Sequence, residues 1–195
     1  MFEFDGLLVF DKLESAVEEI RQRLLRATST LEAAGIPYAV IGGNAVMAWV
    51  EQVDRDAVRF TRDVDIAIRR VDLKNAIAAM EAAGFTYRHA AGMDMFLETP
   101  DGNARSAVHV IFAGEKVRPS DLAPIPDVAE TKSFTTYQVI SLEGLVTMKL
   151  ISFRDKDRTH LRDMIGVGLI DAVWPAKFSP ELGARLQQLL DDPNG

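Results

Sequence analysis

The sequence contains no cysteine among its 195 residues. Disulfide frameworks and thiolate zinc sites are therefore excluded, and nothing points to an oxidising compartment. The chain also lacks any run approaching the ~20 apolar residues that a membrane-spanning helix needs. Its N-terminal stretch has no basic segment and carries acidic residues through its apolar part, unlike a signal peptide. We therefore expect a cytoplasmic protein that makes no membrane contact.

Basic residues are also fewer than acidic ones. Lysine and arginine together number 22 against 29 aspartates and glutamates, and the formal net charge is -7. This balance disfavours broad electrostatic adhesion to nucleic acid or anionic lipid, although a local basic cluster can still bind phosphate. Hydrophobic residues make up 48% of the chain, and a chain of this length buries about 70% of its unfolded surface. A single compact unit is expected.

The chain begins with the pattern of a helix, a strand, a glycine turn and a second helix. Apolar residues at three- and four-residue steps predict an amphipathic helix over residues 11–34, which stops at Gly35. A short apolar strand then leads into Gly42 and Gly43, and the next helix is expected to start at the second of these glycines. The glycine pair therefore lies at a junction between strand and helix.

A second strand and helix follow. The apolar residues within 60–70 predict a strand, and residues 71–84 predict a helix with Asp72 at its start. Residues 85–99 and 106–114 then indicate two strands, joined by a segment that contains an Asp-Gly dipeptide, a common hairpin signal. The sheet is therefore expected to be mixed.

The last third of the chain reads as a loop, a strand and several helices. Residues 115–131 contain three prolines and show no periodicity, which predicts a loop. A short strand over residues 136–141 ends at Ser141, which is a candidate N-cap for the next helix. The helices expected after it cover residues 142–154, 157–168 and 179–192.

Two carboxylates stand close together in the strand of residues 60–70. Asp63 and Asp65 are two residues apart, so their side chains share one face. Like charges at this spacing repel unless a cation lies between them, and a divalent metal is the obvious candidate. Gly42 and Gly43 let the backbone approach a phosphate, and the helix after them offers unpaired amides. Together these features predict a triphosphate site with metal, whereas an Asp-x-Asp pair alone is more often a solvated turn.

In this order the motifs resemble the nucleotidyltransferase superfamily of polymerase-beta type, and most closely its AbiEii-like bacterial group. Gly42 and Gly43 match the glycine turn, and "TRDVD" is similar to the group's Ser/Thr-x-Asp-x-Asp strand, with Asp63 and Asp65 as its carboxylates. "LVTMKLISFRDKDRTHLRDM" resembles the group's lysine-bearing helix and the Arg-Asp helix after it. The resemblance spans roughly residues 35–170.

The resemblance implies a fold and a set of site residues. The fold class would be α/β (α+β), a nucleotidyltransferase-like mixed β-sheet flanked by helices. Its parts, within one compact unit, would be an N-terminal helix (1–34), a core (35–131) and a C-terminal helical annex (132–195). Asp63 and Asp65 would hold Mg²⁺ or Mn²⁺. The residues expected to bind nucleotide are Gly42, Gly43, Asn44, Arg62, Lys149 and Arg154.

One position departs from the family pattern. The superfamily carries a third carboxylate on a later strand, and in "SAVHVIFAG" this position falls on His109. We therefore predict a catalytic set of Asp63, Asp65 and His109. Imidazole is a poor ligand for Mg²⁺ and suits Mn²⁺ better, so the departure weakens the expectation of activity. Asp94 and Glu98, on the preceding strand, are the alternative third ligands if the strand register turns one of them inward.

Other polar residues have ordinary interpretations. Lys149 lies at helical spacing with apolar residues, so a surface lysine is as good an interpretation as a phosphate ligand. Residues 155–157 belong to a run of mixed charge that is typical of a solvated, salt-bridged connection. His89 and His160 have no ligand spacing around them and are assigned no role. Trp49 is expected in the core.

Two hypotheses about function follow. The first is an enzyme that transfers a nucleoside monophosphate from a triphosphate to an acceptor hydroxyl and releases pyrophosphate. The resemblance implies a toxin role for such an enzyme, with RNA or a protein as acceptor and an antitoxin as partner. The second is a catalytically weak or inactive nucleotide-binding or interaction protein, which His109 favours. A domain without any nucleotide is disfavoured, because junction glycines and paired carboxylates cost stability when no ligand binds.

Overall fold

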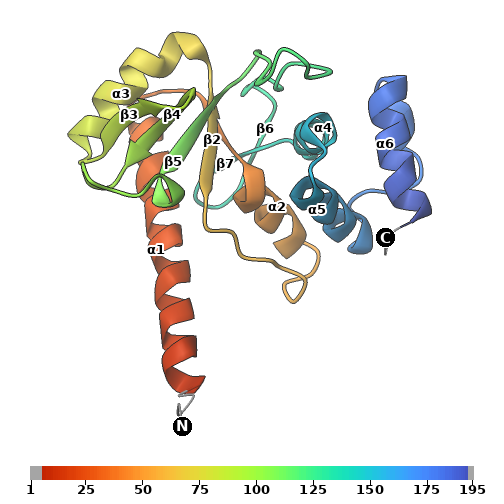
Figure 1. Cartoon of the computed structure of the whole chain (residues 1–195), viewed down its shortest axis with the longest axis horizontal. Coiled ribbons are helices and arrows are strands. Elements are labelled where there is room, and N and C mark those ends of the chain that lie inside the picture. The colour runs from red at the N-terminus through yellow and green to blue at the C-terminus, as the bar shows by residue number, and fades with distance from the viewer. Residues whose placement is uncertain (1–5, 193–195) are drawn as a thin grey trace.

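The structure is a computed structural model that describes residues 6–192. A single mixed β-sheet runs through it in the strand order β3-β4-β5-β2-β1-β7-β6, with helices on both faces (Figure 1). The first five and last three residues of the predicted N-terminal helix and C-terminal annex lie outside the described residues. The strands are β1 (Tyr38–Ile41), β2 (Val64–Ile68), β3 (Thr86–Ala90), β4 (Met93–Leu97), β5 (Val108–Phe112), β6 (Thr131–Ser133) and β7 (Gln138–Ile140). The α-helices are α1 (Gly6–Ala33), α2 (Gly42–Glu51), α3 (Leu73–Ala82), α4 (Leu142–Ser152), α5 (Asp155–Gly166) and α6 (Pro180–Asp191).

The centre of the sheet explains its mixed character. β1 pairs antiparallel with β2 and parallel with β7, while β2 pairs parallel with β5. All residues of β1, and all residues of β2 except Asp65, are buried, because helices cover both of their faces. The mixed sheet flanked by helices confirms the predicted fold class.

Different helices cover the two faces of the sheet (Figure 1). α1 and α3 pack on one face, where Leu31, Ile66, Met80, Phe96 and Val108 line a small apolar cavity. α2 lies against the other face and contacts α4 and α5, which in turn contact α6. The N-terminal part of α1 runs out beyond the sheet. Side chains of β2 and β5 therefore point alternately toward α1 and toward α2.

Several sequence-based expectations need correction. The predicted strand over residues 85–99 is a hairpin of β3 and β4, because Ala91 and Gly92 both have positive φ, at 52° and 75°, and turn the chain. Asp72 closes a short 3₁₀ turn before α3, and its carboxylate does not cap that helix. α2 starts at Gly42 rather than Gly43, and α1 begins before Asp11.

The predicted helices of the C-terminal part are all present. The Ser141 side chain accepts a hydrogen bond from the Gly144 amide, which confirms it as the N-cap of α4. α4 ends at Phe153 in a left-handed conformation with φ of 45°, and α5 starts two residues later. Arg185 of α6 donates hydrogen bonds to the carbonyls of Leu150 (2.7 Å) and Ile151 (3.1 Å) at this end of α4. The guanidinium thus stabilises the corner between α4 and α5 with charge and with hydrogen bonds.

Arg185 should therefore contribute to folding stability. Arg185→Met removes the donors to two helix-terminal carbonyls, and we expect the free energy of unfolding to fall by about 1–3 kcal/mol. Urea unfolding followed by circular dichroism measures this. Arg88→Met is a matched control, because exposed Arg88 also donates to a carbonyl, that of Pro100, at 2.6 Å. Equal losses in both variants would contradict a special role for the α4–α5 corner.

Candidate active site

The glycine turn at the start of α2 lies directly against the Asp-x-Asp strand. The register pairs Ile41 with Asp65, so Gly42 follows at the point where the Asp65 side chain stands. Gly42 has a φ of 68°, and a Cβ atom at this position would overlap the Asp65 carboxylate. A Cβ atom on Gly43 would lie 2.7 Å from the Thr61 side chain. Only glycines allow the N-terminus of α2 to lie this close to β2.

His109 lies beside Asp65, as the sequence predicted. β5 pairs with β2 so that His109 is opposite Asp65, and His109 Nδ1 is 3.4 Å from Asp65 Oδ1. The other ring nitrogen, Nε2, is 2.9 Å from the Ala104 carbonyl oxygen. The hydrogen bond to Asp65 raises the pKa of His109, although partial burial acts in the opposite direction. The position predicted for a third carboxylate therefore holds an imidazole that lies beside Asp65.

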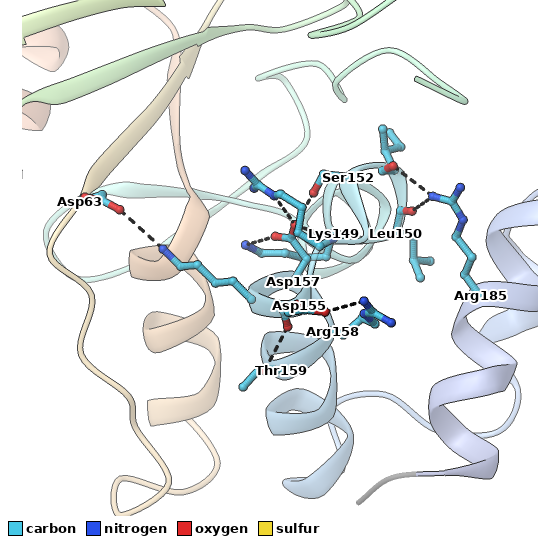
Figure 2. Close-up of polar contacts among 12 residues, drawn as sticks. Asp63, Lys149, Leu150, Ser152, Asp155, Asp157, Arg158, Thr159 and Arg185 are labelled. Carbon is cyan, nitrogen blue, oxygen red and sulfur yellow. Dashed lines mark hydrogen bonds and ion pairs between the residues drawn. The ribbon is translucent and has the colours of Figure 1, made fainter. Parts of the chain in front are cut away.

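Asp63 is held by its backbone and paired by its side chain. The buried Asn44 side chain donates a hydrogen bond to the Asp63 carbonyl oxygen at 2.7 Å. The carboxylate points toward α5, where Lys156 Nζ lies 3.5 Å from Asp63 Oδ2 (Figure 2). Asn44 thus uses its amide to position the backbone of Asp63, directly before β2. Arg62, the residue before Asp63, is exposed.

The alternative third ligands lie on the wrong face of the sheet. Asp94 stands opposite Val110 in the β4–β5 register, while His109 stands opposite Met95. The Glu98 carboxylate accepts hydrogen bonds from Arg23 and Arg26 of α1. Because side chains alternate between faces, Asp94 and Glu98 belong to the α1 side and cannot join Asp65. This interpretation was wrong, because the hairpin at Ala91 set a register that the sequence did not reveal.

Lys149 is buried and paired, so its interpretation as a surface lysine was wrong. Its side chain is 8% exposed, and Nζ lies 3.2 Å from Asp157 Oδ1. Asp157 also accepts hydrogen bonds from Ser152 (2.5 Å), which Figure 2 shows, and from Arg154 Nε (2.9 Å). The sequence-based view of Asp157 as a solvated residue was wrong too, because α5 turns it inward against α4.

This cluster shifts the ionisation of its members and feels the charge of Asp65. Burial lowers the pKa of Lys149, and the charges of Asp157 and Asp65 oppose that effect. Burial alone would raise the pKa of Asp157, but hydrogen bonds from Arg154 and Ser152 and the charge of Lys149 hold it at about 2. The hydrogen bond to Asp157 raises the pKa of Arg154, and the charge of Asp65 adds to this effect. Lys149 and Arg154 therefore lie within electrostatic range of Asp65.

His160 is a buried residue to which the sequence pattern assigns no role. It lies three residues after Asp157 and four after Lys156, so helical spacing alone places all three on one side of α5. Its side chain is buried, and in the described part of the chain Nδ1 has no hydrogen-bond partner. Burial, followed by the charges of Lys149 and Lys156, lowers the pKa of His160 to about 4.

The donor set fits a divalent ion that arrives together with phosphate. Among residues 6–192, no group of three or more His, Cys, Asp or Glu side chains is arranged to hold a metal on its own. Asp63 and Asp65 instead face the nitrogens of Lys156 and His109. Mg²⁺ commonly binds one or two carboxylates and completes its shell with water and substrate phosphates. Two carboxylates beside a glycine turn match this mode.

The chain matches the family model described as "Nucleotidyl transferase AbiEii toxin, Type IV TA system" over residues 23–171. The chain belongs to this family. No curated protein sequence gives a significant match. No helix of residues 6–192 is both long and apolar enough to cross a membrane.

Two solved structures resemble this AbiEii-family chain in fold. The first is an antigenic nucleotidyltransferase-like protein from Paracoccidioides brasiliensis, with 20% identity, a TM-score of 0.61, and coverage of 91% of this chain and 90% of that one. The second is the antibiotic-resistance factor ANT(2'')-Ia, with 10% identity, a TM-score of 0.53, and coverage of 91% and 92% respectively. At these identities the likeness concerns the fold, which is that of a nucleotidyltransferase-like protein.

The buried His160 predicts a pH dependence of folding stability. Its pKa is about 4 in the folded protein and near 6.5 in an unfolded chain, so the unfolded state binds the proton first as the pH falls. The free energy of unfolding should decline from about pH 6.5 toward pH 4, by on the order of 3 kcal/mol. Urea unfolding near pH 7.5 and near pH 5 measures the decline. His160→Gln should reduce it, and an unchanged pH dependence would exclude His160 as its source.

Proposed function

We propose that this member of the AbiEii family binds a nucleoside triphosphate with a divalent ion and transfers the nucleoside monophosphate to an acceptor hydroxyl. The observation that carries the proposal is the contact between Gly42 and Asp65. It places the amide end of α2, which suits phosphate, against the carboxylate that suits a metal. A phosphate bound at the turn and an ion bound at Asp65 would then be neighbours.

The residues around this contact have distinct proposed roles. The N-terminal amides of α2, at Gly42 and Gly43, bind phosphate oxygens, and Lys149, Arg154 and Arg62 contribute positive charge to the same region. A divalent ion on Asp63 and Asp65 supplies neutralisation of the phosphate charge. The acceptor hydroxyl gives up its proton to solvent as its oxygen forms a bond to the α-phosphorus. The bond between the α-phosphorus and the bridging oxygen of the β-phosphate breaks, and pyrophosphate leaves. Asn44 positions the backbone of Asp63 for this arrangement.

His109 affects how tightly such a site binds Mg²⁺. The imidazole pairs with Asp65, so one carboxylate oxygen that would face the ion is already engaged. A neutral imidazole is an acceptable ligand for Mn²⁺ and a poor one for Mg²⁺. We therefore propose a preference for Mn²⁺. The same observation favours the second candidate function, a nucleotide-binding protein with weak catalysis, in which the triphosphate binds and transfer is slow.

The family description adds a biological context. It names a toxin of a type IV toxin-antitoxin system, and we propose that this chain acts as such a component with an antitoxin as partner. The acceptor in this proposal is a hydroxyl of an RNA or of a protein. A pyrophosphate-release assay with either class of acceptor distinguishes them.

The carboxylate pair is tested by removing its charge. In the Asp63→Asn, Asp65→Asn double variant, we expect triphosphate binding in the presence of Mn²⁺ or Mg²⁺ to weaken by at least about a hundredfold, because the ion loses both of its protein ligands. Isothermal titration calorimetry of the parent against the four ribonucleoside triphosphates, with each metal, gives the reference values. Undiminished metal-dependent binding in the double variant would place the site elsewhere.

The third position is tested by restoring a carboxylate. His109→Asp adds an oxygen ligand beside Asp65, and we expect Mg²⁺ with triphosphate to bind about tenfold more tightly and pyrophosphate release with Mg²⁺ to rise. His89→Asp is the matched control, since His89 lies on β3, where its side chain contacts Asp94 on the other side of the sheet. A folded His109→Asp protein with no gain in Mg²⁺ affinity would contradict a metal at this position.

A further inference from the structure

Lys156 is the residue of α5 that reaches the candidate metal ligands. Its side chain is 53% exposed, and its Nζ lies 3.5 Å from Asp63 Oδ2. The carboxylates next to it in the sequence have other partners: Asp155 pairs with Arg158, and Asp157 pairs with Lys149 and Arg154. In Figure 2 a dashed line joins the Asp63 carboxylate, just before β2, to a side chain from α5, and this is the ion pair between Asp63 and Lys156. Lys156 therefore neutralises Asp63 across two elements far apart in the sequence.

We propose that Lys156 is the resident counter-ion of Asp63 in the nucleotide-free protein and moves to the polyphosphate when a divalent ion binds. The inference rests on the proposed function, because it concerns the same site. Lys156 thereby becomes a ligand of the phosphates. Its place beside Asp63 also makes the site favour metal together with nucleotide over metal alone.

The contrast with Lys149 explains why Lys156 is the lysine that moves. Lys149 is buried against the buried Asp157, and its departure would leave a carboxylate without a partner in the interior. The pair of Lys156 and Asp63 is exposed on both sides, with 53% and 37% of the side chains accessible. An exposed ion pair of this kind is weak and exchanges readily with other charges. Lys156 also has a flexible stem and three donors, which suit a moving phosphate ligand.

The movement of Lys156 from Asp63 to the phosphates follows from the charges of the lysine, the metal ion and the triphosphate. An ammonium group and a divalent ion repel each other, so both cannot stay beside the same Asp63 oxygen. An ion that arrives alone must displace Lys156, which then has no new partner. An ion that arrives with a triphosphate brings the phosphate oxygens that Lys156 needs. Removal of the lysine should therefore have opposite effects on the two kinds of ligand.

Lys156→Gln tests this by calorimetry with two probes. The first is MnCl₂ alone, which we expect to bind about threefold or more tightly in the variant, because its competitor is gone. The second is the ribonucleoside triphosphate that the parent binds most tightly, titrated at saturating Mn²⁺. We expect its affinity to fall about tenfold or more, because a phosphate contact is lost. Lys156→Arg keeps the charge and should stay near the parent for both probes.

Lys74 provides a matched control for the Lys156 variant. Lys74→Gln makes the same change of charge on α3, which covers the opposite face of the sheet, and should alter neither affinity. A parent protein that binds no triphosphate at all would overturn the proposed function itself. If the parent binds triphosphate, then a Lys156→Gln variant in which both affinities fall, both rise or both stay constant would overturn the role of Lys156 alone.

Discussion

The antiparallel pairing of β1 with β2 is the constraint on which the candidate site depends. It places Ile41 opposite Asp65, and the chain must then turn into α2 at the point where the Asp65 carboxylate projects. A residue with a Cβ atom cannot occupy position 42, because the left-handed backbone and the carboxylate both exclude it. The same pairing brings Thr61 onto Gly43. A turn suited to phosphate and a carboxylate suited to metal are thus consequences of one strand register.

Charge compensation is the second organising feature, and it joins the C-terminal helices to the sheet. The protein carries a net charge of -7, yet cations gather around the Asp-x-Asp strand. Lys156 pairs with Asp63 and offsets part of the negative charge of this strand end, while the His109 imidazole lies beside Asp65. Behind them, Lys149 and Arg154 are fixed by the buried Asp157. α6 supports this arrangement from outside through Arg185, which lies beyond the residues matched by the family model.

Membership of the AbiEii family favours nucleotidyl transfer, whereas a histidine at position 109 favours weak catalysis with Mg²⁺. The family and the fold are those of nucleotidyltransferases, while the position at which we predict a third carboxylate holds an imidazole that interacts with Asp65. The structure also excludes a replacement from β4, because Asp94 and Glu98 face α1. We therefore propose that metal preference is the property in which this chain departs most from the three-carboxylate pattern expected from its sequence.

The sequence by itself determined the features that depend on neighbouring residues. These include the glycine turn that begins α2, the strand that carries Asp65, the N-cap at Ser141 and the alternation that turns His109 away from Val108 and Val110. Periodicity and local hydrogen bonding fix such features within a few residues. Only the tertiary structure decided the hairpin at Ala91, the face that Asp94 occupies, the burial of Lys149 with Asp157, and the reach of Lys156 to Asp63. Each of these depends on contacts between segments distant in the chain, and a run of mixed charge looks the same in sequence whether water or another helix receives it.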